Sequence, residues 1–544
     1  MQSRRVTSGR CAGRPWIFLS WVSLALILAM MVVLAFLLCM NSFRAWWPAR
    51  LELARLVDGS ALLGFPVNRD ISPEGDVRIQ YRVGNREIYS GADFRWVREK
   101  DITGKEYPRE AVLVERAENG NFMGFLRSAP NAGTVGGAFA EFSEWLRQVR
   151  AKWDMSVEPL RRRLAALGNE WQANNLAVLK AGYENDRAEK TLNKGDWASR
   201  LKKGRKRAVE IERESEEVIG RLVGEKAILL AETAAFVTAD GREILLPVPS
   251  IIEATRPNAM GLAERALHFA KNGWNLLARN PREANTEGGL FPALFGTVVL
   301  VFIMAITAFP LGVAAGIYLR EYARDGILAR AARVAINNLA GVPSIVYGIF
   351  GLGFFVYGVG GGIDRLLYPE RVAAGVSTFG GGGVLWSSLT LGLLTLPVVV
   401  VATEEALANI PSEIRQGSLA LGATRFQTLW RVVLPMAGPG ILTGFILAMA
   451  RAAGEVAPLM LTGAVKSAPD LPLDGGWPFV HLERKFMHLG FHIYDMGFQS
   501  PNVEASKPLV YQTALVLLVL VFVLNLSAMM LRRRMRDKYA MRGF

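Results

Sequence analysis

Six long apolar stretches constrain this chain of 544 residues more than any other feature. A helix needs about 20 consecutive apolar residues to cross the hydrocarbon core of a bilayer. Backbone polar groups find no water there, so each crossing must be helical. The first stretch is longer than a signal-peptide core, and no small-residue cleavage site follows it, which predicts a retained span. The expected spans are 16–40, 291–319, 334–359, 384–401, 439–462 and 508–531.

The segment 41–285, between the first two expected spans, contains no apolar stretch of that length. Its first part alternates apolar and polar residues, as at Val77, Ile79 and Tyr81, which is typical of half-buried strands. From about 138 to 232 the composition shifts to Leu, Ala, Glu, Lys and Arg, which indicates two or three long helices. We therefore expect one α+β domain with a helical protrusion.

The distribution of basic residues sets the expected topology. The net charge is +14, and Lys and Arg are enriched in cytoplasmic loops near membrane spans. One basic cluster follows the second expected span and another follows the last, so six crossings from a cytoplasmic N-terminus place both clusters in the cytoplasm. The clusters are Arg320, Arg324, Arg330 and Arg333, and then Arg532, Arg533, Arg534, Arg536 and Lys538. The expected organisation is a cytoplasmic N-terminus 1–15, a first transmembrane helix 16–40, an external insert 41–285, a core of five transmembrane helices 286–531 and a cytoplasmic tail 532–544.

A further basic cluster, 202–207, lies in the predicted helices of the insert. Such a cluster can be interpreted as a patch for nucleic acid or nuclear targeting. Five glutamates follow it between 210 and 217, however, and this alternation of charge is typical of a solvated helix face. We therefore expect no nucleic-acid partner.

The stretch 404–435 lies between two apolar spans but is amphipathic and carries charges of both signs, so we expect it at the membrane surface. Pro411 suits the first turn of a helix, where its missing N–H is not needed. Thr424 can cap a second helix over about 425–433. Pro435 is expected to stop that helix.

Small residues dominate the first of these two predicted helices. Gly417, Ser418 and Ala420 give a face with almost no side chains, which another protein can approach closely. Gly422 can adopt the left-handed conformation that ends a helix.

Two opposite charges stand within the apolar span that follows. Arg451 and Glu455 are four residues apart, so a continuous helix places them on one face. Ionisable residues inside a membrane usually face a bundle interior or an aqueous path. A guanidinium suits an oxyanion because it offers paired N–H donors. The alternative is a structural ion pair that holds the bundle together.

Catalytic groups are scarce. No Walker-type phosphate loop is present, so the chain is not expected to hydrolyse ATP, and no Cys or His set has zinc-site spacing. We predict no catalytic residue, no bound metal and no cofactor. His481, His488 and His492 cluster in the last external loop, where an interface contact or plain exposed histidines are commoner than a metal site.

The amphipathic stretch 404–435 resembles the EAA loop, the cytoplasmic coupling loop of importer-type ABC permeases. That pattern is Glu-Ala-Ala, three residues, Gly, nine residues, then Ile-x-Leu-Pro. The resemblance implies that the loop inserts into a cleft on an ATPase subunit and transmits its motion. The matching positions are Gln416, Gly417 and Ser418 for the triplet, Gly422 for the glycine, and Val432, Leu434 and Pro435 for the end, with Gln416 replacing the acidic residue.

Five further motifs narrow the resemblance to the phosphate-specific ABC importer permeases of PstA type. They are GGLFPALFGT (288–297), PLGVAAGIYLREYA (310–323), NLAGVPSIVYGIFG (338–351), TLPVVVVATEEAL (395–407) and ARAAGEVAPLMLTG (450–463). The similarity runs from about 288 to 544, and the segment 41–285 looks like the extra N-terminal domain of longer members.

This resemblance implies an all-α polytopic membrane protein with six transmembrane helices in the type I ABC importer permease fold, and a large α+β periplasmic insert between helices 1 and 2. The implied function is the permease subunit of an ATP-driven phosphate importer in the bacterial inner membrane, with both termini cytoplasmic. The implied partners are a sister permease, two ATP-binding subunits that hydrolyse the ATP, and a periplasmic phosphate-binding protein. Arg451 and Glu455 would lie on the translocation path.

Two alternatives remain at this level. The first is a permease for another oxyanion, such as sulfate or molybdate. The second is a membrane-anchored sensor or scaffold, in which the external domain acts and the spans only anchor it. A scaffold has no need of a coupling loop or of a charge pair within a span.

Overall fold

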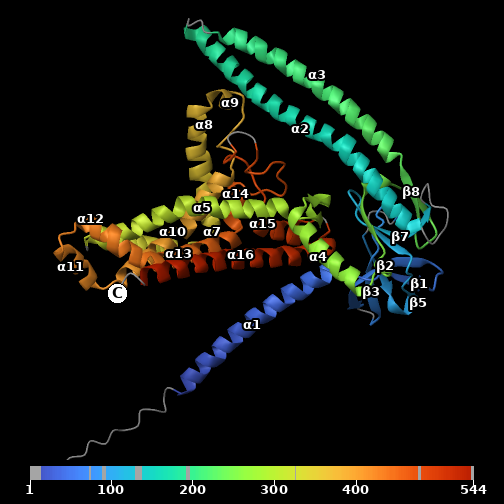
Figure 1. The fold of residues 1–544 in the computed structure, drawn as a ribbon, viewed down its shortest axis with the longest axis horizontal. Helices are drawn as coiled ribbons and strands as arrows, with labels where there is room; N and C mark the ends of the chain where they lie inside the picture. The colour runs from blue at the N-terminus through green and yellow to red at the C-terminus, as the bar shows by residue number, and fades with distance from the viewer. Residues whose placement is uncertain are drawn as a thin grey trace, which may run out of the picture.

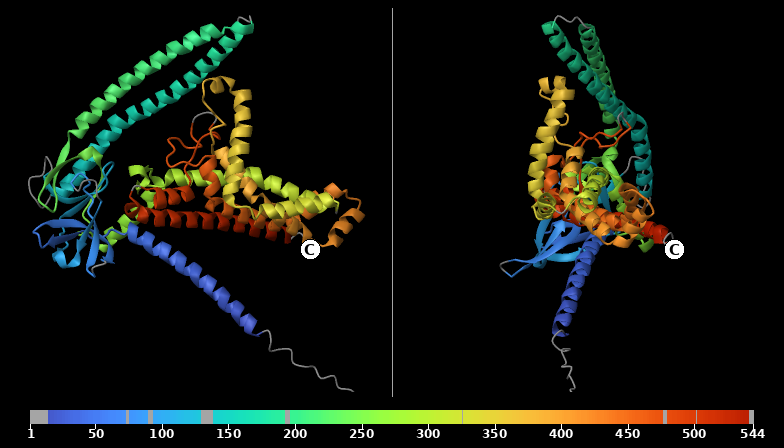
Figure 2. Two further views of the ribbon diagram at one scale, coloured as in Figure 1. Left: turned by 180° about the vertical axis from the view of Figure 1, so that it is seen from behind. Right: turned by 90° about the vertical axis from the view of Figure 1, so that its left-hand side faces the viewer.

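The computed structural model describes residues 14–72, 75–88, 93–128, 138–191, 196–324, 326–475, 479–500 and 502–540. A helical bundle carries a strand-rich domain at one end, and a long helical hairpin extends from that domain (Figure 1, Figure 2). Six helices within these ranges are long and apolar enough to cross a membrane, the expected number. They are Phe18–Trp46, Phe291–Tyr322, Ser344–Leu367, Val384–Ala408, Arg425–Gly454 and Val503–Asp537.

In the described part of the insert, the strands form two five-stranded antiparallel sheets. The first has the order β4 (Phe94–Arg98), β3 (Val77–Arg82), β2 (Ala61–Ile71), β1 (Glu52–Leu56), β5 (Ile102–Glu106). The second has the order β10 (Ile251–Thr255), β6 (Ala111–Arg116), β7 (Phe122–Ser128), β8 (Thr233–Val237), β9 (Glu243–Pro247). The strand expected at Val77, Ile79 and Tyr81 is confirmed as β3, but its burial does not alternate, because Gln80 is buried together with Ile79 and Tyr81.

The helical protrusion of the insert is an antiparallel hairpin between β7 and β8. It consists of α2 (Ala138–Thr191) and α3 (Trp197–Leu230). Buried residues of α3 recur at intervals of seven and four, the spacing of a narrow coiled-coil seam. They are Ile211, Val218, Leu222 and Leu229, and they pack against Val157, Leu160, Leu164 and Leu167 of α2. The hairpin reaches back along the bundle, where α2 contacts α9 (Pro369–Ala373).

A short ribbon joins the insert to the bundle after α4 (Leu262–Ala278). Strands β11 (Pro281–Arg282) and β12 (Glu287–Gly288) enclose Glu283, Ala284 and Asn285, whose φ angles are 47°, 52° and 73°. Positive φ is uncommon outside glycine, so surrounding contacts must hold this turn. Asn285 donates to the Lys466 carbonyl at 2.9 Å, and half-buried ion pairs tie the ribbon to both sheets. These pairs are Arg82–Glu287, Arg86–Glu283 and Arg282–Glu115.

Helix α10 (Val384–Ala408) lies at the centre of the bundle, between α5 (Phe291–Ile317) and α13 (Leu434–Gly454). Glycines four residues apart on each neighbour allow the close approach, as in other membrane helix pairs. A Cβ at Gly312 would lie 2.7 Å from Val399, and one at Gly444 would lie 2.4 Å from Ala402. Helix α16 (Val503–Ala540) packs on α13 and on α1 (Arg14–Trp46), which diverges from the bundle (Figure 1).

The third expected span, 334–359, has the wrong boundaries. Helix α6 (Ile327–Leu339) ends before a turn. Helix α7 (Ser344–Phe350) follows this turn and continues through a wide π-helical segment, Gly351–Gly360, into α8 (Gly361–Leu367). Pro343 is the extended N-cap of α7, with ψ of 137°. A proline disfavours helical geometry in the residue before it, so α6 does not continue through Val342. Helix α8 is followed by the short α9, and a loop then leads to α10.

The loop after α9 is held by one buried carboxylate. Asp364, which is 2% exposed, accepts backbone N–H bonds from Thr378, Phe379 and Gly380, each at 2.9 Å. Hydrogen bonds to a charged acceptor are stronger than those between neutral groups. Asp364 therefore fixes the path of the chain from α9 to α10.

Replacing Asp364 by Asn should loosen this loop. Asn keeps the shape but loses the charge and one acceptor oxygen, so opening of the loop should become easier by about 2 kcal/mol. Hydrogen–deuterium exchange at the amides of Thr378, Phe379 and Gly380 measures this directly. Asp154→Asn, at an exposed position of α2, is the matched control. Unchanged exchange at the three amides in Asp364→Asn would contradict the assignment.

Candidate functional site

Arg451 and Glu455 do form a pair. The Arg451 Nε and Glu455 Oε1 atoms are 3.5 Å apart, and the two side chains are 40% and 21% exposed. This distance is longer than a good hydrogen bond, so the guanidinium keeps donors for another acceptor. The pair is thus a loose one, with the cation on the exposed surface of the single chain.

The expectation that both residues share one helix face is wrong. Helix α13 ends at Gly454, and Glu455 has extended geometry, with φ of −78° and ψ of 136°. A second helix, α14, begins at Ala457 and ends at Thr462. Pro458 lies in its first turn, where a proline starts a helix easily, and Gly454 precedes the break. The expected span 439–462 is therefore two helices with non-helical backbone between them.

The turn between α6 and α7 lies beside this break. The Tyr347 hydroxyl donates to the carbonyl of Leu339, the last residue of α6, at 2.7 Å. A Cβ at Gly348 would lie 2.8 Å from the Pro458 Cα, so α7 packs closely against α14. Irregular backbone at membrane depth is tolerated where protein buries it or where it lines an aqueous path. Two such breaks and one charge pair therefore gather at one place.

The stretch 404–435 folds into two short helices at the end of the bundle opposite the insert (Figure 1). The first, α11 (Ser412–Ala420), ends before Gly422, whose φ of +85° is the left-handed conformation that the sequence predicts. Thr424 accepts a bond from the Gln427 backbone N–H and caps α12 (Arg425–Thr428), also as predicted.

Pro435 does not end the second helix, contrary to the sequence prediction. The chain passes from α12 through a wide turn, Leu429–Val433, directly into α13, with Pro435 in the first turn of that helix. The Leu434 N–H bonds to the Leu429 carbonyl five residues back, a π-helical bond. This wider turn accommodates the proline, which supplies no N–H and would clash within a regular helix.

The predicted coupling residues divide into two groups. Gln416 and Gly417 are exposed, and a Cβ at Gly417 would meet nothing within 4 Å, so the bare face exists there. Ser418 turns inward and shares a hydrogen bond of 2.9 Å with Thr428 of α12. Gly422 is exposed at the turn. The remaining residues, Val432, Leu434 and Pro435, are half-buried and attach α12 to the bundle.

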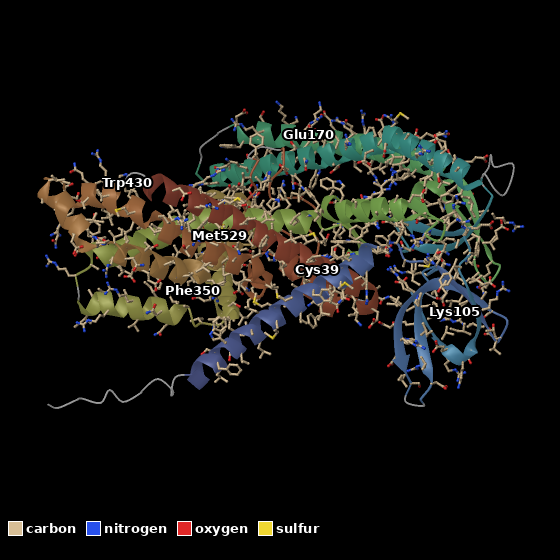
Figure 3. All side chains as sticks on the ribbon, turned by 60° about the horizontal axis from the view of Figure 1, so that its bottom comes forward. Cys39, Lys105, Glu170, Phe350, Trp430 and Met529 are labelled. Carbon is tan, nitrogen blue, oxygen red and sulfur yellow. The ribbon has the colours of Figure 1, made fainter. Side chains whose placement is uncertain are left out.

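Sequence reasoning missed an apolar surface on the same stretch. Leu421 is 90% exposed, Phe426 is 64% exposed and Trp430 is 62% exposed. The rings of Phe426 and Trp430 stack with centroids 6.2 Å apart. Trp430 lies at the end of the bundle far from Lys105 of the insert (Figure 3). Exposed apolar groups close together often mark a protein interface, but no pattern in the sequence separates them from core residues.

The three histidines are buried, so plain exposed histidines are the wrong interpretation. His481 is 8% exposed and lies 3.1 Å from Asp474, while His488 and His492 are 0% and 2% exposed around α15 (Leu489–Tyr494). Burial lowers the pKa of His488 to about 3, and burial lowers that of His492 to about 4, against an opposing effect of the Asp495 charge. Within the described ranges, no three His, Cys, Asp or Glu residues gather as metal ligands.

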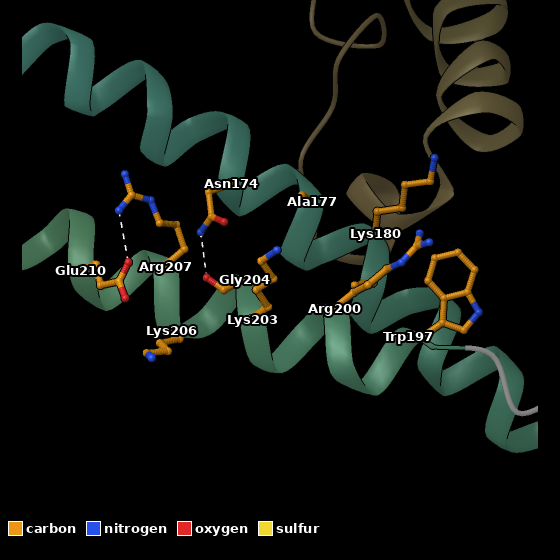
Figure 4. A pocket seen from close by; sticks show the side chains of 11 residues that line it. Asn174, Ala177, Lys180, Trp197, Arg200, Lys203, Gly204, Lys206, Arg207 and Glu210 are labelled. Carbon is orange, nitrogen blue, oxygen red and sulfur yellow. Dashed lines mark hydrogen bonds and ion pairs between the residues drawn. The ribbon is translucent and has the colours of Figure 1, made fainter.

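The basic cluster 202–207 lies on the exposed side of α3. It borders an open cleft of about 680 Å³ on the hairpin (Figure 4). Arg207 pairs with Glu170 of α2 and with Glu210. The ion pairs between α2 and α3 fit the expectation of a solvated helix face.

Comparisons with known proteins concern the helical core. Residues 308–537 match the family described as "Binding-protein-dependent transport system inner membrane component". The "Probable ABC transporter permease protein YqgI" of Bacillus subtilis is 34% identical over 248 residues, 44% of this chain and 76% of the relative. The "Phosphate transport system permease protein PstA 1" of Mycobacterium tuberculosis is 33% identical over 260 residues, 48% of this chain and 75% of the relative.

A similar protein from an archaeon and a solved structure extend this set. The "Probable phosphate transport system permease protein PstA" of Methanocaldococcus jannaschii is 33% identical over 239 residues, 43% of this chain and 73% of the relative. Among solved structures, the inward-facing MetNI methionine ABC transporter is 20% identical over 45% of this chain and 95% of that chain, with a TM-score of 0.33.

Acid should destabilise the protein through the buried histidines. Because the pKa values of His488 and His492 lie below the ordinary 6.5, an unfolded chain takes up protons that the folded chain cannot. The contribution of the two rings to the free energy of unfolding is complete above pH 6.5. Below that value, the contribution of each ring falls by about 1.4 kcal/mol per pH unit. His492→Phe removes one titrating ring. As the pH falls from 7 to 5, the melting temperature of this variant should therefore rise relative to that of the wild-type protein. A difference that does not change with pH would contradict this.

Proposed function

Because this chain belongs to the binding-protein-dependent transport system inner membrane component family, we propose that it is the transmembrane permease subunit of an ATP-driven importer of inorganic phosphate. Phosphate is proposed as the substrate because the chain is similar to phosphate permeases. It covers about three quarters of their length at 33% identity. A permease is a membrane channel subunit rather than an enzyme, and the hydrolysis of ATP belongs to a separate partner subunit.

The arrangement of the chain supports a simple topology. The insert and the stretch 404–435 lie at opposite ends of the bundle (Figure 1), so a membrane around the bundle would separate them. We assign 404–435 to the cytoplasm, together with both termini, and the insert 41–285 to the periplasm. This assignment agrees with the basic clusters after the second and last spans.

The proposed partners follow from this topology. Two copies of an ATP-binding subunit would bind at the bundle end that carries Gly417, Leu421 and Trp430, and a sister permease would complete the path. A phosphate-binding protein would deliver the anion from the periplasm. The loop 404–435 would transmit closure of the ATP-binding subunits, so that the bundle alternates between outward- and inward-facing states.

Arg451 is proposed as a transient station for the anion. Its guanidinium offers a fork of N–H donors that matches phosphate oxygens. Glu455, at 3.5 Å, competes with phosphate for the same charge and so limits how tightly it is held. Weak holding is required, because a path must release its ion as well as accept it. The exposed side of Arg451 would face the sister subunit.

Arg451→Gln should lower phosphate uptake into vesicles by at least about tenfold, since one charge-assisted contact is worth roughly 1.5–3 kcal/mol. The amount of assembled complex should stay unchanged, because Gln keeps much of the side chain and the pair with Glu455, at 3.5 Å, is a loose one. The matched control is Arg365→Gln, another exposed arginine of the core. Normal uptake by Arg451→Gln would refute the proposed station.

A competition experiment tests the substrate. If sulfate or molybdate inhibited the uptake of labelled phosphate as strongly as unlabelled phosphate does, the alternative substrate would be favoured.

Leu421→Asp should weaken binding of the ATP-binding subunit. A leucine side chain buried on docking contributes about 2 kcal/mol, so affinity should fall by up to about 30-fold. The yield of ATP-binding subunit that co-purifies with the permease measures this effect. Leu262→Asp, at a site 80% exposed within the insert, should have no effect. Equal co-purification of both variants would show that this surface is not the docking site.

A further inference from the structure

One arginine of the coupling loop points into the bundle, although two residues close to it on the same helix are exposed. Arg415 lies on α11 between the exposed residues Glu413 and Gln416, yet its side chain is only 21% exposed. Its guanidinium donates from Nη1 to the Ile410 carbonyl at 2.9 Å and from Nη2 to the Leu407 carbonyl at 2.7 Å. Arg415 is therefore turned away from the surface that an ATP-binding subunit would meet.

The same guanidinium also reaches a carboxylate far away in the sequence. Nη2 of Arg415 donates to Oε1 of Glu321 at 2.9 Å, and the Glu321 side chain is 20% exposed. Glu321 lies in the wide turn Tyr318–Tyr322, which extends α5. Leu407 lies in the last turn of α10. One side chain thus joins α11 to the ends of both α5 and α10.

The turn that carries Glu321 is bound from a second side as well. Arg333 of α6 donates to the Leu319 carbonyl at 2.8 Å and to Glu404 of α10 at 3.2 Å. The turn itself closes with a bond from the Ala323 N–H to the Tyr318 carbonyl, five residues back. Wide turns of this kind often occur at functional sites. Two arginines from different elements therefore fix the end of α5.

The remaining attachment of α11 is apolar. Ile414 is half-buried against a cluster that includes Ile410 and Val433. Apolar contacts have no direction, so they allow a helix to slide or rotate, whereas charge-assisted hydrogen bonds hold a fixed geometry. Ser418 links α11 to α12 by one hydrogen bond, but within the described residues the directional contacts of α11 with α5 and α10 are the Arg415 bonds.

We propose that Arg415 and Glu321 are the positioning pair through which movement of α11 is transmitted to α5. The inference rests on the proposed function, because it assumes that an ATP-binding subunit moves α11. Without the pair, α11 would still dock but would move over the apolar cluster, and α5 would follow only in part. The pair would then set how much transport each hydrolysed ATP yields.

The test uses vesicles that hold the permease, its sister, the ATP-binding subunits and the phosphate-binding protein. Glu321→Gln keeps the shape of the acceptor and removes its charge, and Arg415→Ala removes the link. The phosphate transported per ATP hydrolysed should fall by about 2- to 30-fold, the range for residues that carry coupling. The double variant should be no worse than Arg415→Ala alone. Glu106→Gln, which breaks the exposed pair with Arg55 in the insert, is the matched control and should leave the ratio unchanged.

The ratio separates transmission from a merely structural role. A structural role would lower the amount of complex, and uptake and hydrolysis would then fall together at a constant ratio. A constant ratio in both Glu321→Gln and Arg415→Ala would overturn the proposal. If the wild-type vesicles take up no phosphate, the proposed function fails, and a second measurement still decides the inference.

That measurement uses spin labels at Glu413 of α11 and Tyr322 at the end of α5, both outside the pair. In the wild-type complex the distance between the labels should stay the same with and without ATP, because the two elements move together. In Glu321→Gln the distance should change on addition of ATP. If ATP changed the distance between the labels equally in the wild type and in Glu321→Gln, the proposal would be overturned, whatever the substrate.

Discussion

The close approach of three helices at glycine faces underlies the whole core. A Cβ at Gly316 of α5 would lie 2.7 Å from Thr403, and one at Gly440 of α13 would lie 2.6 Å from Ala406. Any larger side chain at these positions would push α10 away from its neighbours. Because the end of α10 supplies Glu404 to Arg333 and the Leu407 carbonyl to Arg415, the packing of the glycines also sets where the proposed coupling loop lies. Helix α10 therefore contributes both to the packing of the core and to the position of the proposed coupling loop.

The proposed functional residues of the core lie where regular helix is interrupted. The break at Glu455, the turn before α7 and the wide turn at Tyr318–Tyr322 each leave backbone groups that a continuous helix would satisfy. Charged or hydroxyl side chains lie at each of them: Arg451 at the first, Tyr347 at the second and Glu321 at the third. The proposed anion station and the proposed transmission to the ATP-binding subunits both use such interruptions, at different depths of the bundle.

Local signals in the sequence predicted much of this, and long-range contacts explain what they missed. Apolar length indicated six spans, and Gly422 and Thr424 ended and began helices as their chemistry requires. Pro435 misled because a wide turn upstream accommodates it, a feature with no sequence signature. Glu321 and Arg415 are 94 residues apart, so no spacing rule could pair them. The burial of His488 likewise depends on helices elsewhere in the chain.

The left-handed turn at Glu283–Asn285 has a mechanical consequence. Its ion pairs involve both sheets of the insert, so the strand-rich domain cannot rotate freely against the adjacent end of the bundle. Helix α2, with 54 residues, is about 80 Å long. A tilt of only a few degrees where the domain is attached would displace the far end of the hairpin by several ångströms. Since α2 touches α9, small rearrangements at the end of α5 next to the insert would become larger displacements of the segment that leads to α10.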